Sequence, residues 1–123
     1  LRGKDGSVEI VDFKTEKKPD VNAPDDRLKL DRYRRQLEIY AHIVEERYGK
    51  RVSRMHLYYT GAKDGNPYIS YDYESKKIDK TITAVGAVVR RIEDGDFSTK
   101  GVEKTERHCQ SCDIKPYCWQ SNA

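Results

Sequence analysis

The chain lacks any long apolar segment, and its 123 residues contain only three cysteines and one methionine. No apolar run approaches 18 residues, so we predict neither a membrane-spanning helix nor a membrane partner. The first residues lack the charged start and apolar core of a signal peptide. An odd number of cysteines does not suit a secreted disulfide framework, and we therefore expect a reducing, cytoplasmic compartment.

A strong excess of one charge is also missing, because 24 basic residues oppose 21 acidic ones and leave a net charge of +3. That balance identifies no partner. Basic residues do gather locally, and five of them fall within nine positions: Arg27, Lys29, Arg32, Arg34 and Arg35. Such a cluster attracts phosphate or forms a solvated helix face, and charge alone leaves both interpretations open.

Hydrophobic residues make up 36% of the chain and gather in periodic segments, as expected of one folded domain. We expect a core over residues 1–94 and an irregular cysteine-rich tail over residues 95–123. The core pattern predicts, in order, a strand at 7–14, a helix at 27–48, strands at 52–60 and 68–73, and a helix at 76–93. This order predicts an α/β fold with a mixed β-sheet flanked by helices.

Each predicted helix carries an apolar stripe, which we interpret as its core face. The first stripe consists of Leu30, Tyr33, Leu37, Ile39, Tyr40, Ala41, Ile43, Val44 and Tyr48. The second stripe consists of Ile78, Ile82, Val85, Val89 and Ile92. Asp25 or Asp26 is the expected cap of the first helix, Gly49 its expected end, and Ser75 the expected cap of the second helix.

The strand at residues 7–14 is rich in apolar residues and also carries the charged side chains of Asp12 and Lys14. Residues two apart on a strand face the same way, so this carboxylate and this ammonium project together. Asp12 offers oxygen ligands to a hard cation such as Mg²⁺, and Lys14 offers positive charge to a phosphate or holds a water. An ordinary ion pair on the strand surface is the alternative interpretation.

Gln36 interrupts the apolar stripe of the first helix, with Tyr40 one turn further along the same face. A buried amide without a hydrogen-bond partner costs about 1–3 kcal/mol, so both polar groups need partners. They either meet a polar site on the sheet, or Gln36 reaches water and Tyr40 packs in the core.

Three cysteines, Cys109, Cys112 and Cys118, follow each other closely in the tail. Thiolates at this spacing bind zinc or an iron–sulfur cluster, and a tetrahedral site needs a fourth ligand. His108 is one candidate for that ligand, although adjacent residues rarely reach one ion. A fourth cysteine outside this chain is the alternative that we favour.

Together these segments resemble the PD-(D/E)XK nuclease superfamily in its RecB-like branch. Residues 8–15 resemble the strand that carries the metal ligand and the lysine, and residues 36–40 resemble the Gln-x-x-x-Tyr helix motif. The cysteine pattern resembles the last three ligands of the [4Fe–4S] cluster in AddB-type and CRISPR-associated nucleases. The resemblance covers residues 7–118 and implies a restriction-endonuclease-like core.

The resemblance also implies roles for single residues. Asp12 and the backbone carbonyl of Phe13 would bind Mg²⁺ or Mn²⁺, and Lys14 and Gln36 would act in catalysis. Tyr40, Arg32 and Arg35 would contact DNA. Cys109, Cys112 and Cys118 would bind an iron–sulfur cluster, or zinc as the alternative.

Two family features are not found in these residues: the metal-binding Asp of the preceding strand and the first cluster cysteine. Residues 1–6 resemble the end of that strand and its turn, where Asp5 is a poor substitute for the missing ligand. We therefore expect part of a longer DNA repair or recombination nuclease, an exonuclease linked to a helicase, and expect this fragment alone to be inactive. The alternative is a non-catalytic DNA-binding or scaffolding module that keeps the fold.

Overall fold

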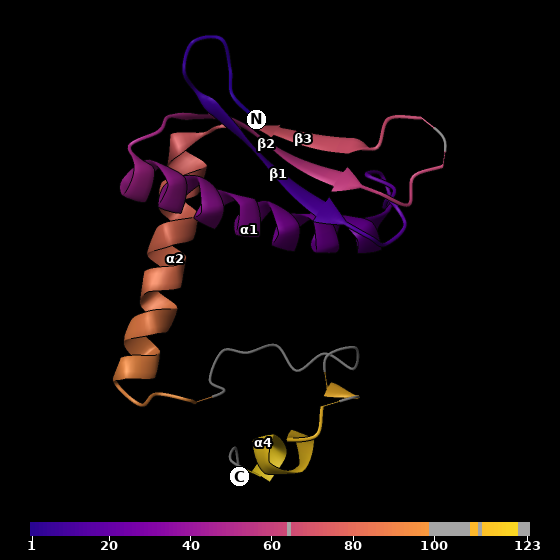
Figure 1. The fold of residues 1–123 in the computed structure, drawn as a ribbon. Helices are drawn as coiled ribbons and strands as arrows, with labels where there is room; N and C mark the ends of the chain where they lie inside the picture. Colours follow the sequence, from indigo (N-terminus) through magenta and orange to yellow (C-terminus); the bar gives the residue numbers. More distant parts are fainter. Residues whose placement is uncertain (64, 99–108, 111, 121–123) are drawn as a thin grey trace. The chain divides into compact units, whose positions relative to one another are not determined.

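The computed structural model describes residues 1–63, 65–98, 109–110 and 112–120 (Figure 1). Its contacts divide the chain into two compact units, Leu1–Ala87 and Val88–Ala123. The elements run in the order β1 (Val8–Lys14), α1 (Pro24–Tyr48), β2 (Val52–Tyr59), β3 (Tyr68–Asp72), α2 (Ser75–Glu93) and α4 (Lys115–Gln120). In the described part of the tail, α4 is a short helix where the sequence predicted irregular structure.

The three strands form one mixed sheet in the order β1-β2-β3. β1 and β2 pair in parallel, and α1 is the crossover between them, whereas β2 and β3 pair antiparallel as a hairpin. Figure 1 shows α1 lying along one face of this sheet. The predicted α/β fold with a mixed sheet and flanking helices is therefore confirmed, and the observed strand ends lie within one residue of the predicted ones.

Helix α1 begins three residues earlier than predicted and is capped differently. Ala23 occupies the cap position without a side-chain hydrogen bond, and Pro24 occupies the first turn, where its missing N–H costs nothing. Asp25 and Asp26 lie in that first turn, so the prediction that one of them is the cap is wrong. The predicted end is confirmed, because Gly49 adopts a left-handed conformation with φ of 60°.

The core lies between α1 and the sheet. Its buried apolar side chains are Leu30, Leu37 and Ala41 from α1, Val52, Met55, Leu57 and Tyr59 from β2, and Ile78 from α2. β2 is the central strand, which explains why it supplies half of this set. The predicted stripe of α1 is too wide, because Tyr40, Ile43 and Tyr48 are exposed.

Helix α2 contributes less to the core than its stripe predicted. Ile78 is buried and Ile82 packs against the core, but Val85, Val89 and Ile92 are 39%, 46% and 56% exposed among the described residues. The prediction of a continuous core face is therefore wrong beyond the first turns. A buried polar contact joins α2 to α1 instead, because the Thr81 hydroxyl donates to Glu38 over 2.5 Å.

The sheet face opposite α1 is held together by a polar row. His56 on β2 is buried, and its ring nitrogens lie 3.1 Å from the Glu9 carboxylate on β1 and 2.8 Å from the Ser70 hydroxyl on β3. These contacts satisfy the imidazole on both sides and join the three strands. Among the described residues, no helix has the length and apolarity needed to cross a membrane.

Candidate active site

The ammonium of Lys14 is the centre of the polar group between β1 and α1. Its Nζ lies 2.8 Å from Asp12 Oδ2 and donates to Gln36 Oε1 over 3.2 Å. Asp12 and Lys14 share the α1 face of β1 because side chains alternate along a strand. The parallel crossover then lays Gln36 of α1 over that face. The structure therefore brings together the three residues that the sequence singled out.

Asp12 keeps one carboxylate oxygen without a hydrogen bond. Oδ2 is buried and forms the ion pair with Lys14, but the contact lacks hydrogen-bond geometry, and this oxygen has no hydrogen-bond partner in the described structure. A carboxylate oxygen has several lone pairs, so an oxygen that accepts no hydrogen bond is a suitable ligand for a hard cation such as Mg²⁺ even beside an ammonium. The chemistry of Asp12 therefore fits the predicted metal.

The Phe13 carbonyl lies on the open edge of β1. The Lys14 carbonyl accepts a hydrogen bond from the Thr60 N–H on the β2 side over 3.0 Å. Successive carbonyls of a strand alternate in direction, so the Phe13 carbonyl points to the opposite edge, along which no described strand pairs next to Phe13. The Phe13 side chain is 65% exposed on the face away from α1. Only its backbone oxygen is therefore available beside Asp12.

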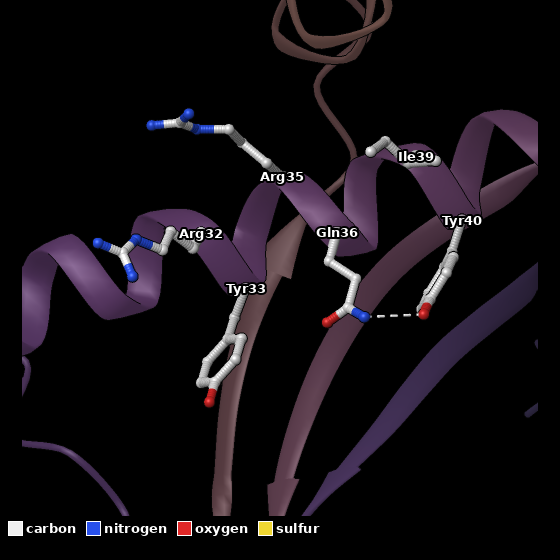
Figure 2. A pocket seen from close by; sticks show the side chains of 6 residues that line it. All are labelled: Arg32, Tyr33, Arg35, Gln36, Ile39 and Tyr40. Atoms are coloured by element: carbon white, nitrogen blue, oxygen red, sulfur yellow. Dashed lines mark hydrogen bonds between the residues drawn. The ribbon is translucent and has the colours of Figure 1, made fainter. Parts of the chain in front are cut away.

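Both polar atoms of the Gln36 amide form hydrogen bonds. Its oxygen accepts from Lys14, and its nitrogen donates to the Tyr40 hydroxyl over 2.8 Å (Figure 2). Of the two interpretations of Gln36, the one in which it meets a polar group of the sheet is therefore correct. Tyr40 is 39% exposed, which excludes the interpretation of this ring as ordinary core.

A pocket of about 500 Å³ opens beside this amide and is lined by Arg32, Tyr33, Arg35, Gln36, Ile39 and Tyr40. Figure 2 shows Tyr33, Gln36 and Tyr40 projecting from one side of α1, whereas Arg32 and Arg35 point away from them. Both arginines are exposed. They therefore supply positive charge at the rim of the pocket rather than direct contacts to Lys14.

Two further residues belong to the site: Glu16, which the sequence did not single out, and Tyr33, which the sequence indicated only as part of an apolar stripe. Lys14 Nζ lies 3.7 Å from the centroid of the Tyr33 ring, and the Tyr33 hydroxyl donates to Glu16 over 2.6 Å. Lys29 pairs with the same Glu16 carboxylate. The hydrogen bond to Glu16, together with burial, raises the pKa of Tyr33 to about 12. The spacing of Tyr33, one turn before Gln36, was the available signal.

Both carboxylate oxygens of Asp5 make contacts away from Asp12 and Lys14. Residues 3–6 form a turn closed by the Gly3 N–H and the Ser7 carbonyl over 2.8 Å, and Arg2 bridges Val8 antiparallel. Within this turn Asp5 accepts hydrogen bonds from the Ser7 hydroxyl and backbone, which lower the pKa of its carboxyl, and it pairs with Arg51. These contacts agree with the expectation that Asp5 is a poor metal ligand.

The cysteines form no disulfide, and all three are partly buried. The Cys112 N–H donates to the Cys109 carbonyl over 3.4 Å, and Cys118 lies in α4. No group of three metal-ligating side chains occurs in the part of the chain that the structure describes, so it lends no support to the cluster prediction. His108, the alternative fourth ligand, lies outside the described residues.

The arrangement combines a buried carboxylate oxygen, a backbone oxygen on an open strand edge and an oriented ammonium. Such a set can bind a divalent cation and stabilise negative charge on a phosphate. A family model described as the PD-(D/E)XK nuclease superfamily matches residues 1–119. No curated protein and no solved structure matches the chain.

Proposed function

Because the chain belongs to the PD-(D/E)XK nuclease superfamily, we propose that it supplies part of the catalytic core of a metal-dependent deoxyribonuclease. The observation that carries this proposal is the Lys14 ammonium, held within 2.8 Å of Asp12 and 3.2 Å of Gln36. An ammonium fixed beside a carboxylate that has a free lone pair suits phosphodiester hydrolysis better than a solvated surface ion pair does.

In this proposal the residues of the site have different tasks. Asp12 and the Phe13 carbonyl would hold Mg²⁺ or Mn²⁺, and the bound ion would supply Lewis-acid stabilisation to the scissile phosphate. Lys14 positions the attacking water and stabilises the negative charge that develops on the phosphate. Gln36 fixes the direction of the Lys14 side chain, and its bond to Tyr40 fixes the amide in turn.

We further propose that the DNA backbone approaches along the pocket beside Gln36. Arg32 and Arg35 place positive charge at the rim of this pocket, and Tyr40 presents a partly exposed ring there. Basic side chains at a groove bind phosphates without reading sequence. The finer proposal is an exonuclease of the RecB-like branch that acts with a helicase in DNA repair or recombination in the cytoplasm.

The test compares cleavage of labelled DNA by the full-length protein and by Lys14→Ala, with Lys50→Ala as the control. Lys50 is exposed between α1 and β2, so its loss changes net charge equally without touching the site. We expect Lys14→Ala to lower the rate by about 100- to 1000-fold and Lys50→Ala to leave it unchanged. Equal rates for Lys14→Ala and wild type would exclude a catalytic role for Lys14.

A second candidate function is a non-catalytic DNA-binding or scaffolding module. One observation favours it: of the two carboxylates described in the site, Asp12 and Glu16, the second already binds Tyr33 and Lys29. Asp12 is then left as the single carboxylate for a metal ion. This candidate predicts DNA binding without metal-dependent cleavage. Binding and cleavage measured on the same DNA, with Mg²⁺ or with chelator, separate the two functions.

We also propose that Cys109, Cys112 and Cys118 bind a [4Fe–4S] cluster together with a fourth ligand from outside this chain. Thiolates at close spacing in a segment with little apolar content suit a cluster. Anaerobic purification of the full-length protein tests this proposal, because a cluster gives a brown protein with iron and sulfide. A colourless protein containing zinc would replace the cluster with the alternative metal.

A further inference from the structure

The Lys14 ammonium has a third neighbour besides Asp12 and Gln36. Its Nζ lies 3.7 Å from the centroid of the Tyr33 ring, which is within the range of a cation–π contact. The Lys14 side chain is only 15% exposed, so little water competes for the charge. The ring face is therefore a wall of the space that holds the ammonium.

Tyr33 is itself fixed at its far end. Its hydroxyl donates to Glu16 Oε1 over 2.6 Å, and Glu16 is paired with Lys29 on the preceding turn of α1. The hydrogen bonds from Lys29 and Tyr33 lower the pKa of Glu16, so it remains a charged acceptor at neutral pH. Glu16 lies in the segment after β1 and thereby joins this segment to the helix that carries Tyr33.

A lysine side chain needs such support because its four-carbon stem is flexible and its ammonium is a point charge. Asp12 and Gln36 both contact the ammonium, and the face of the Tyr33 ring adds a third contact that further restricts its position. A hydrogen bond from the phenol to a carboxylate also increases the negative charge of the ring, which strengthens its attraction for a cation.

We propose that Tyr33 and Glu16 are positioning residues for Lys14: the ring of Tyr33 fixes the ammonium, and Glu16 fixes the ring. This inference rests on the proposed nuclease function. It adds two residues that lie outside the two motifs of residues 8–15 and 36–40. Ordinary core packing of Tyr33 is the competing explanation, and it gives no reason for the contact with Lys14.

The first test needs no catalysis. Protons on the Lys14 stem that lie over an aromatic ring resonate upfield in NMR spectra, and the signal is assigned by its loss in Lys14→Arg. We expect this upfield shift in the wild-type chain, a smaller shift in Tyr33→Phe and Glu16→Ala, and none in Tyr33→Leu. A normal Lys14 shift in the folded wild-type chain would overturn the inference.

Tyr73→Phe is the matched control. The Tyr73 hydroxyl also donates to a carboxylate, Glu45, over 2.7 Å, and its pKa is also raised to about 12 by that bond. The substitution therefore removes the same kind of hydrogen bond from a tyrosine that, in the described structure, makes no hydrogen bond or ring contact with Lys14. We expect an unchanged Lys14 signal and unchanged cleavage.

The second test measures DNA cleavage by the same variants of the full-length protein. A displaced ammonium lowers kcat directly, whereas Arg32 and Arg35 still supply positive charge to the pocket that Tyr33 lines. We therefore expect Tyr33→Leu to lose about 10- to 100-fold in kcat and to change KM by less than kcat. Tyr33→Phe, which keeps the ring, should recover most of that loss.

Wild-type kcat in Tyr33→Leu would overturn the inference. A wild-type protein that cleaves no DNA would overturn the proposed function instead, and the NMR shift would still test the contact.

Discussion

Tyr59 carries a polar atom in a place that water does not reach. Its side chain is fully buried, and its hydroxyl has no hydrogen-bond partner in the described structure. Burial raises the pKa of Tyr59 above its ordinary value, because charge on the phenol would be poorly solvated. A buried hydroxyl without a partner is a cost to the folded state rather than a gain.

Tyr59→Phe is therefore expected to leave the free energy of unfolding unchanged or to raise it by up to about 1 kcal/mol. Tyr73→Phe serves as the comparison, since its hydroxyl donates to Glu45 and its loss should cost about 0.5–1.5 kcal/mol. Urea denaturation at neutral pH measures both variants. A loss larger than 1 kcal/mol in Tyr59→Phe would show that its hydroxyl has a partner.

Local periodicity was enough to predict some of the side-chain pairs of the site. Asp12 and Lys14 meet because strands repeat every two residues, and Gln36 and Tyr40 meet because helices repeat every 3.6. The pair of Tyr33 and Glu16 follows no such rule. The segment between β1 and α1 sets their distance, and no local period describes an irregular connection.

Two glycines show how a helix interior and a helix end differ. Gly49 ends α1 with φ of 60°, a conformation that a residue with a Cβ adopts only with strain. Gly86 lies inside α2 with ordinary helical geometry, and a Cβ added there would meet nothing within 4 Å. The same substitution should therefore act in opposite directions at these two positions.

We expect Gly49→Ala to lower the free energy of unfolding by about 1 kcal/mol and Gly86→Ala to raise it by about 0.5–1 kcal/mol. The gain at Gly86 arises because alanine has less backbone freedom to lose in the unfolded chain. Thermal and urea denaturation of both variants measure the two effects. Two changes of the same sign would contradict this account of the helix end.

Element boundaries were predictable where a residue type dictates one conformation, as Gly49 does at the end of α1. They were less predictable where several residues compete. Asp25 and Asp26 both suit a cap, but Pro24 already fixes a helical φ and starts the helix before them. The core face predicted for α2 was too long for a different reason. An apolar period shows that a helix face can be buried, but not how many turns of that face pack against another element.

For the molecule as a whole, the order of strands and helices was sufficient to predict the mixed sheet. A strand, a helix and a second strand favour a parallel crossover, and a short turn then favours an antiparallel hairpin. The polar row of Glu9, His56 and Ser70 was not predicted, because cross-strand register decides it.

Alkaline pH should destabilise the molecule through two partly buried phenols, those of Tyr33 and Tyr73. Bonds to Glu16 and Glu45 raise the pKa values of Tyr33 and Tyr73 from 10.0 to about 12. Each phenol therefore contributes stability that is fully present below pH 10 and is lost as the pH rises through about 12, because the unfolded chain releases its proton first.

The double variant Tyr33→Phe/Tyr73→Phe should be less stable than wild type at neutral pH, but it should lose less stability between pH 9 and pH 11. Urea midpoints at these values measure the difference. Parallel losses in the two proteins would contradict the assignment of the alkaline transition to these tyrosines.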